Sequence, residues 1–319
     1  MTENLTKKKF KEKDSFQPIP QNASSKGILS NTKKFGYKLT RQTLNVQTIK
    51  KRNFEIIGFL DESLSERVLQ NLKSALKQSK KVRKIELSFA RFLGVKRLNN
   101  TMKSFKGVIS LQSIYFNFSE NCYILNNPTG CIRKCIKKSR FLKEIVLNFN
   151  SCVHLRDAAF QNLSKCLKAC ALLQKVELHL SWCLEITTIG FYLLSKSLKR
   201  LTSLHNASFD FSSCYCITDE RLQFLVMNLK GLVNLECLSL FFHYCDLITD
   251  KGLYGLCEIV LKLPCLQKIS LSFKGCREIS LQGEEKIKEM FMKHPSFLKF
   301  GKCPRFRLNV EFKRRKFRE

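Results

Sequence analysis

The sequence predicts a right-handed α/β solenoid, a horseshoe with a parallel sheet on its concave face and helices on its convex face. The first observation behind this prediction is an internal repeat, which has to be recognised before any single motif is interpreted. Similar segments recur every 31 residues and begin at Leu111, Leu142, Leu173, Leu204, Leu235 and Leu266. An earlier copy begins at Val82, slightly less than one period before Leu111, and a degraded copy begins at Phe297.

The second and third observations are the two hydrophobic periods within each unit. The first part alternates, as at Leu238, Leu240 and Phe242, which is typical of a short strand with one buried face. The second part has apolar residues three or four positions apart, which is typical of a helix. These helical positions are Phe160, Leu163, Leu167, Phe191, Leu194, Leu198, Leu222, Leu225, Leu229, Leu253, Leu256 and Val260. One unit cannot bury its apolar face alone, so the units must stack.

Three regions follow from the pattern. Residues 53–300 are expected to form about eight repeat units, and a first cap is expected from residues 53–59 with a helix over 63–76. Residues 1–52 are basic and rich in polar residues, which predicts a disordered tail. Residues 301–319 contain alternating Phe306, Leu308, Val310 and Phe312, which predicts a capping strand over the open sheet edge, followed by a basic tail.

The repeated pattern L-x-x-h-x-h-x-F-x-x-C, where h is apolar, resembles the leucine-rich repeat family. It occurs from Leu142 to Cys152, and two later copies are followed by Ile-Thr-Asp at 217–219 and 248–250. The resemblance covers residues 54–300 and is strongest to the long-unit classes typified by ribonuclease inhibitor and by the cysteine-containing repeats of F-box proteins. Similar arrays occur in ciliates. The resemblance implies a horseshoe that binds other proteins.

The fifteen cysteines are predicted to be reduced thiols, because the chain shows neither a secretory signal nor a run of about 18 apolar residues that could span a membrane. The resemblance assigns five of them to a structural ladder, in which a buried side chain satisfies backbone groups where the chain leaves each strand. These are Cys152, Cys183, Cys214, Cys245 and Cys276, and Asn121 fills the same position one unit earlier.

Two further cysteine pairs raise the alternative of a zinc site. Cys131 with Cys135 and Cys166 with Cys170 are four residues apart on successive predicted helices, which is a spacing that zinc ligands use. The repeat phase places them at or beside core positions, so buried thiols are favoured. We predict no metal and no cofactor.

The segment Val153–Asn162 resembles the catalytic loop of a protein kinase, because His154, Arg156, Asp157 and Asn162 have that loop's order. However, Asp157 is in phase with Asp219 and Asp250, where a carboxylate favours a helix N-terminus. No glycine-rich phosphate loop accompanies the segment. We therefore predict a structural role for it, no catalytic residues and no enzymatic activity.

The strand positions that alternate with the buried ones should line the concave face. Most of them are small and polar, so the aromatic and histidine residues among them and at the adjoining turns are candidates for partner binding. These candidates are Tyr115, His179, Trp182, Phe241, His243 and Tyr244. The alternative for Trp182 and Tyr244 is that they fold back over the cysteine ladder.

The chain has 57 Lys and Arg against 26 Asp and Glu, for a net charge of +31. Residues 1–53, 54–150, 151–300 and 301–319 carry +10, +11, +4 and +6, so the charge concentrates in the tails and the first half. The candidate basic patch, expected on outer helices and their ends, is Lys80, Lys81, Arg83, Lys84, Arg133, Lys134, Lys137, Lys138 and Arg140. Such a surface either binds RNA, DNA or an acidic protein, or is a solvated lysine-rich face.

Together these features predict a monomeric, cytoplasmic scaffold that binds an unknown protein partner on its concave face. The alternative is a nucleic-acid or ribonucleoprotein-associated protein that uses the basic tails, which also fit a nuclear address. No RNA-binding motif supports that alternative. A remote alternative is an adaptor, or a relative of repeat proteins that carry a kinase, with no kinase domain in this chain.

Overall fold

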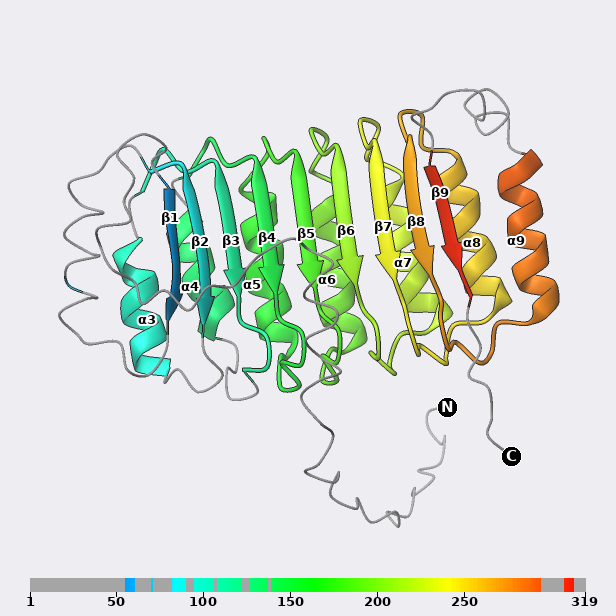
Figure 1. The fold of residues 1–319 in the computed structure, drawn as a ribbon, viewed down its shortest axis with the longest axis horizontal. Helices are drawn as coiled ribbons and strands as arrows, with labels where there is room; N and C mark the ends of the chain where they lie inside the picture. The colour runs from blue at the N-terminus through cyan, green and yellow to red at the C-terminus, as the bar shows by residue number, and fades with distance from the viewer. Residues whose placement is uncertain are drawn as a thin grey trace, which may run out of the picture. The chain divides into compact units, whose positions relative to one another are not determined.

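A computed structural model describes residues 55–60, 70, 82–89, 95–105, 108–121, 127–136, 139–293 and 307–312. Its described elements belong to one compact unit, Gln42–Glu319. The described strands form a nine-stranded parallel sheet in chain order (Figure 1). They are β1 (Glu55–Leu60), β2 (Lys84–Phe89), β3 (Ser113–Asn117), β4 (Glu144–Asn148), β5 (Lys175–His179), β6 (Asn206–Asp210), β7 (Cys237–Phe241), β8 (Lys268–Ser272) and β9 (Arg307–Glu311).

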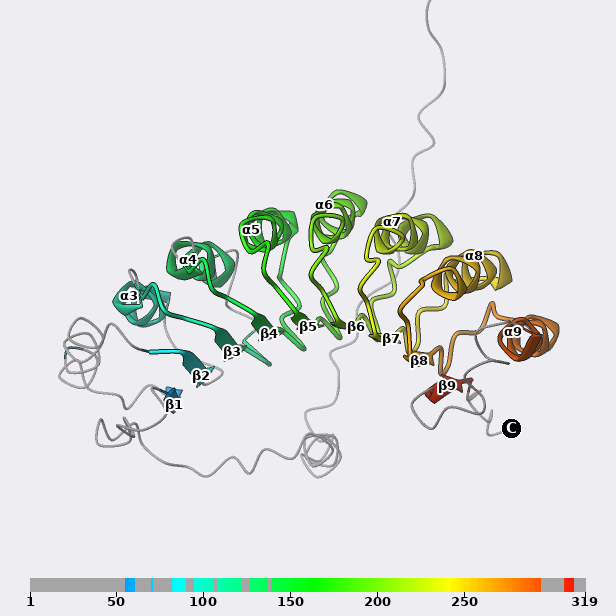
Figure 2. The ribbon, with the colours of Figure 1, turned by 90° about the horizontal axis from the view of Figure 1, so that it is seen from above.

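A helix follows each strand from β2 to β8, as the two periods predict. The described helices are α3 (Val95–Ser104), α4 (Asn127–Ile136), α5 (Asp157–Lys168), α6 (Thr188–Leu198), α7 (Asp219–Leu229), α8 (Asp250–Leu261) and α9 (Leu281–Lys293). Within this unit the helices lie along the outer side of an arc and the strands along its inner side (Figure 2). The predicted fold class, an α/β solenoid with a concave parallel sheet, is confirmed.

The strand register reproduces the repeat period. Glu144 of β4 pairs with Lys175 of β5, Lys175 with Asn206, and Asn206 with Cys237. At the C-terminal end the period is not kept, because Lys268 of β8 pairs with Arg307 of β9, which is a longer step than between the preceding strands. The start of the degraded unit predicted from Phe297 lies outside the described residues. The strand predicted from the alternation of residues 306–312 is β9.

The tail at 1–52 and the expected helix at 63–76, except for the helical Gln70, lie outside the residues described. None of the described helices has the length and apolar character needed to cross a membrane.

The core contains a row of phenylalanine rings just after the strands, interrupted at one unit. Neighbouring rings are nearly parallel, with centroids 5.2 Å apart for Phe118 and Phe149 and 5.8 Å apart for Phe211 and Phe242. Phe273 and Phe312 extend the row to β9, at 5.9 Å. Leu180 takes the place of phenylalanine between Phe149 and Phe211, and it is also buried. The ring row couples each unit to the next through apolar contact.

The helix starts also follow the sequence. Thr187, Thr218 and Thr249 adopt extended backbone conformations, and their hydroxyls accept hydrogen bonds from backbone N–H groups in the first turn of α6, α7 and α8. These are N-caps, which satisfy donors that an isolated helix leaves open. The helical positions predicted to face the core are all buried.

Candidate functional site

A sharp turn follows each strand from β3 to β8, and one residue in it has a positive φ of 57–76°. These residues recur at the repeat period: Glu120, Ser151, Trp182, Ser213, Tyr244 and Gly275. Consecutive turns are linked by backbone hydrogen bonds, such as Trp182 N–H to Ser212 O at 3.0 Å and Tyr244 N–H to Lys274 O at 2.8 Å. The turns therefore form a regular, hydrogen-bonded edge along the sheet.

Five large apolar side chains on three consecutive turns of this edge are exposed, and we call them the apolar edge. They are Trp182, Leu184, Tyr215, Tyr244 and Leu247, with exposed fractions from 37 to 50%. The Trp182 and Tyr215 rings meet edge to face, with centroids 6.0 Å apart. Trp182 is 46% exposed and Tyr244 37% exposed, and the Tyr244 ring lies against Gly275, the residue before Cys276 of the ladder.

The packing of Tyr244 at this edge requires a glycine at position 275. The Tyr244 ring lies so close to it that a Cβ on Gly275 would be 2.4 Å from Tyr244 Cδ1. The φ of Gly275, +76°, also favours glycine. The end of the apolar edge is thus fixed by the contact between a tyrosine ring and a glycine backbone.

On the concave face, the candidates fall into two groups. His179 and Phe241 lie in one register row, with Asp210 of β6 between them. The Phe241 ring contacts the ring of His243 edge to face at 6.0 Å. Tyr115 lies apart from them on β3, two strands before β5.

One contact between described residues on this face, between His243 and Ser272, invites a catalytic interpretation. His243 Nε2 lies 2.8 Å from Ser272 Oγ, as in a nucleophile–base pair. However, Ser272 is 1% exposed, and its hydroxyl also lies 3.4 Å from Glu311 Oε2. Burial lowers the pKa of His243, so the ring is neutral at neutral pH. The hydroxyl is closed to a substrate in this arrangement.

The five ladder cysteines make one repeated hydrogen bond. Each thiol donates to a carbonyl oxygen 34 residues earlier, in the preceding unit, at 3.0–3.3 Å. The acceptors are Phe118, Phe149, Leu180, Phe211 and Phe242. In the unit before, Asn121 Nδ2 donates to Phe89 O at 3.3 Å. The ladder thus satisfies a buried carbonyl at the end of each strand.

We expect the ladder thiols to resist alkylation in the folded protein, whereas the exposed Cys265 reacts. Burial raises the pKa of Cys214 and Cys276 to about 12, so little reactive thiolate forms at pH 8. Brief iodoacetamide treatment, followed by peptide mapping with and without urea, measures this. Equal labelling of Cys265 and Cys214 without urea would contradict the ladder.

The cysteines considered as zinc ligands lie in the helical layer. Cys135 Sγ lies 2.9 Å from Met102 O, and burial raises the pKa of Cys170 to about 12 and that of Cys166 further. Within the described residues, no three His, Cys, Asp or Glu side chains form a group that could hold a metal ion. The side chain of Cys131 lies outside that set.

The kinase-like residues have separate structural contacts. His154 Nδ1 and Arg156 Nε each lie 2.5 Å from a carboxylate oxygen of Glu185, one unit later. Asp157 accepts hydrogen bonds from the backbone N–H groups of Thr187 and Gly190, both at 3.1 Å. Asp157 therefore supports the start of the next helix, α6.

This aspartate contact is repeated along the solenoid. Asp219 accepts from Thr249 N–H at 2.9 Å, and Asp250 accepts from Ser280 N–H at 2.9 Å. A glycine in the first turn of the next helix lies against each aspartate, at Gly190, Gly252 and Gly283, and a Cβ there would lie 2.1–2.4 Å from the carboxylate.

One pair of consecutive units, those of α6 and α7, departs from this pattern at both positions. It has Thr188 in place of aspartate and Arg221 in place of glycine, and Arg221 Nε donates to Thr188 Oγ1 at 3.1 Å. The carboxylate and the glycine are thus replaced together.

No protein-family model and no curated protein matches the sequence. Among solved structures, the fold is similar to the yeast Rad7–Elc1 complex, with a TM-score of 0.40 and 15% identity over 70% of this chain and 64% of that chain. It is also similar to the tropomodulin C-terminal domain of Caenorhabditis elegans, with a TM-score of 0.32 and 10% identity over 73% of this chain and 96% of that one. The chain thus spans just under two thirds of the Rad7–Elc1 chain that it matches.

The predicted basic patch is only partly placed. Among its members, side chains are described for Arg83, Lys84, Arg133 and Arg140, and the others lie outside the described set. Lys84 was expected on the outer helices and is not there, because it is the first residue of β2. There its ammonium pairs with Glu86 at 3.3 Å. The alternation of the strand puts Lys84 on the concave side.

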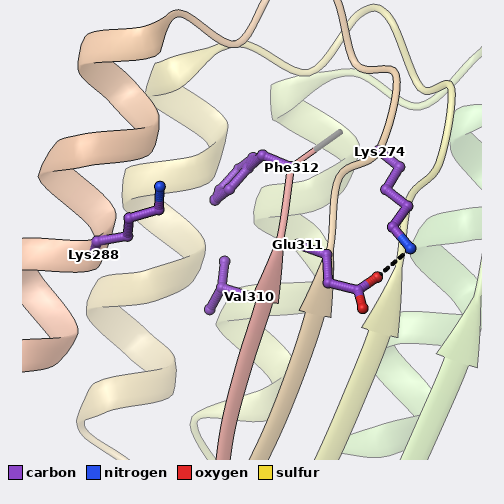
Figure 3. Close-up of a pocket in the computed structure, with 5 residues that line it drawn as sticks. All are labelled: Lys274, Lys288, Val310, Glu311 and Phe312. Atoms are coloured by element: carbon purple, nitrogen blue, oxygen red, sulfur yellow. Dashed lines mark ion pairs between the residues drawn. The ribbon is translucent and has the colours of Figure 1, made fainter. Parts of the chain in front are cut away.

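A cavity of about 410 Å³ lies beside β9, between this strand and α9 (Figure 3). Val310 and Phe312 form its apolar part, whereas Lys274 pairs with Glu311 at 2.5 Å on the other side of the strand. Residues 294–306 and 313–319 lie outside the described residues. The cavity brings together none of the predicted site residues.

Proposed function

We propose that the chain is a non-catalytic protein-interaction module, which binds its partner across the apolar edge and the neighbouring part of the concave face. The observation that carries the proposal is the exposure of five large apolar side chains on three consecutive turns. Exposed apolar groups gathered in one place mark interaction surfaces. Trp and Tyr, three of the five, are the residue types that most often dominate binding energy.

The rigidity of the edge supports the same proposal. The turns of Trp182, Ser213 and Tyr244 are each hydrogen-bonded to the following unit. Side chains held on such a frame lose little conformational freedom when a partner binds, which favours affinity. The absence of catalysis is part of the proposal, and it is supported by the burial of Ser272 beside His243 and by the structural contacts of Asp157.

We further assign the units to the ribonuclease-inhibitor-like, cysteine-containing class of leucine-rich repeats, on the basis of the thiol ladder. The twelve cysteines whose side chains the structure describes are free thiols, which favours a reducing compartment such as the cytoplasm or nucleus.

Replacing Trp182 and Tyr215 together by alanine is expected to weaken partner binding by about 30-fold or more, because hot-spot residues contribute about 2 kcal/mol or more. Folding should be preserved, since both side chains are nearly half exposed. The measurement is affinity capture from cells of the source organism, with the wild-type chain and the double variant each used as bait. Calorimetry with the recombinant partner then gives the affinities.

The matched control is Met227→Ala on α7, whose side chain is 65% exposed on the convex side. It removes a similar exposed apolar group from the opposite face and should leave the affinity unchanged. A partner that binds the double variant as tightly as the wild type would contradict the proposed surface. Nucleic acid captured in place of protein, with a steep dependence on salt, would favour the alternative function.

A further inference from the structure

The charges of the concave face differ from those of the chain as a whole. From β2 to β8, the middle and last outward positions of the strands hold three carboxylates, Glu86, Glu177 and Asp210, and no Lys or Arg. The lysines at the strand positions of this face, Lys84, Lys175 and Lys268, begin their strands, and Lys274, just after β8, is paired with Glu311. The chain has a net charge of +31, but the two rows formed by the middle and last outward positions of these strands are acidic.

Two of the three carboxylates are neutralised within the face. Glu86 pairs with Lys84 at 3.3 Å, and Glu177 pairs with Lys175 at 3.0 Å. His179, with Nε2 3.8 Å from Glu177 Oε2, and Lys175 hold the pKa of Glu177 below its usual value. These two groups offer little net charge to a partner.

Asp210 differs from both. Its Oδ1 accepts a hydrogen bond from Ser212 N–H at 3.0 Å, and no Lys, Arg or His in the described part of the chain forms an ion pair with it. The nearby His243 is neutral at neutral pH, because burial lowers its pKa despite the attraction of Asp210. Asp210 is half-buried, so its charge is less screened than that of a fully exposed carboxylate.

The surroundings of Asp210 suit a cation. Phe241 is its register partner on β7, and His179 is its partner on β5. Neighbouring strands are about 4.8 Å apart, so a side chain that reaches the carboxylate also reaches the Phe241 ring. A guanidinium or ammonium group gains from both the carboxylate and an aromatic face. Ser212, two residues after Asp210, accepts the hydrogen bond of Trp182 N–H, which places Asp210 next to the apolar edge.

We propose that Asp210, with Phe241 beside it, is the anchor for a Lys or Arg side chain of the protein partner. This inference rests on the proposed function and specifies the partner's chemistry: a segment with a basic residue near apolar ones. The positive charge of the chain opposes such a partner only at long range, because physiological salt screens charges beyond about 8 Å. Contact at Asp210 is decided by the local charges.

The test is selection from a displayed library of random nonapeptides with the wild-type chain and with Asp210→Asn and Asp210→Lys. Wild-type binders are expected to share Lys or Arg at one position and to bind Asp210→Asn at least tenfold more weakly. Asp210→Lys is expected to select Asp or Glu at that position. Glu258→Lys, on the exposed side of α8, makes the same change in net charge and should select the same peptides as the wild type.

Three results would overturn the inference: no peptides selected by the wild type, wild-type binders without a basic residue, or equal affinity for Asp210→Asn. Failure of the proposed function would show instead in the capture experiment described above. If partner capture depends on Trp182 and Tyr215 while peptide selection shows no basic preference, the interaction surface stands and only the role of Asp210 is wrong.

Discussion

Replacing Phe211 by alanine is expected to lower the free energy of unfolding by about 3–5 kcal/mol, the usual cost of removing a buried phenylalanine ring. Phe211 is 1% exposed, and its ring contacts those of Phe191, at 5.0 Å, and Phe242, at 5.8 Å. The cavity would interrupt the row of rings in the middle of the solenoid, where each unit is stabilised by its neighbours. Urea unfolding followed by circular dichroism measures the change.

The matched control is Phe241→Ala. Phe241 has the same side chain on the neighbouring strand, but it faces the concave surface and is only half-buried. Its loss is expected to cost about 1 kcal/mol or less. Equal costs for the two substitutions would mean that the ring row is not what couples the units.

Replacing Gly190 by alanine is expected to destabilise the protein by about 1–3 kcal/mol, the usual cost of overpacking. Elsewhere in a helix this change is stabilising by roughly 0.5–1 kcal/mol. At Gly190 the added Cβ would lie 2.4 Å from Asp157 Oδ1, so the carboxylate would be displaced. Its hydrogen bonds to the start of α6 would be lost with it. Thermal and urea unfolding measure the change.

The effect of Gly190→Ala on the free energy of unfolding is expected to change sign once the Asp157 carboxylate is removed. In an Asp157→Ala background, Gly190→Ala should be neutral or slightly stabilising, because the remaining close neighbour is the edge of the Phe160 ring at 3.2 Å. Gly255→Ala on α8 is the control, since a Cβ there meets nothing within 4 Å and the full stabilisation is expected. A cost at Gly190 that persists without Asp157 would contradict this account.

Much of the fold could be predicted from the sequence, because the apolar residues of a solenoid repeat the same positions in every unit. Strand and helix faces and the order of the sheet follow from that phase. The strand β9 does not follow from it, because the insertion between β8 and β9 breaks the period, and this strand was predicted from its own alternation of apolar residues instead.

The second role of the aspartates was also missed. Asp157 was interpreted through its own helix start, whereas its carboxylate also binds the start of the next helix, 30 residues later. A signal was present: a glycine follows Asp157, Asp219 and Asp250 at one fixed distance, slightly longer than the repeat, whereas Arg221 lies at that distance from Thr188. Comparing only positions in the same phase hides a pairing that crosses from one unit to the next.

The candidate site was predicted less completely than the fold. Trp182 and Tyr244 stood out as aromatic residues at the turns, but Tyr215, which contacts Trp182, was missed along with Leu184 and Leu247. Leu184 and Tyr215 are one repeat period apart, so large apolar residues at one turn position were the available signal. Lys84 was misplaced because its basic cluster continues into a strand.

The most direct test of the central claim is hydrogen–deuterium exchange of the chain, alone and with the partner captured by the wild-type protein. We expect slower exchange in the turns 181–184, 212–215 and 243–247 and in the adjoining ends of β5, β6 and β7. The convex helices α5–α8 should be unchanged. Slower exchange confined to those helices, with the three turns unaffected, would contradict the proposed interaction surface.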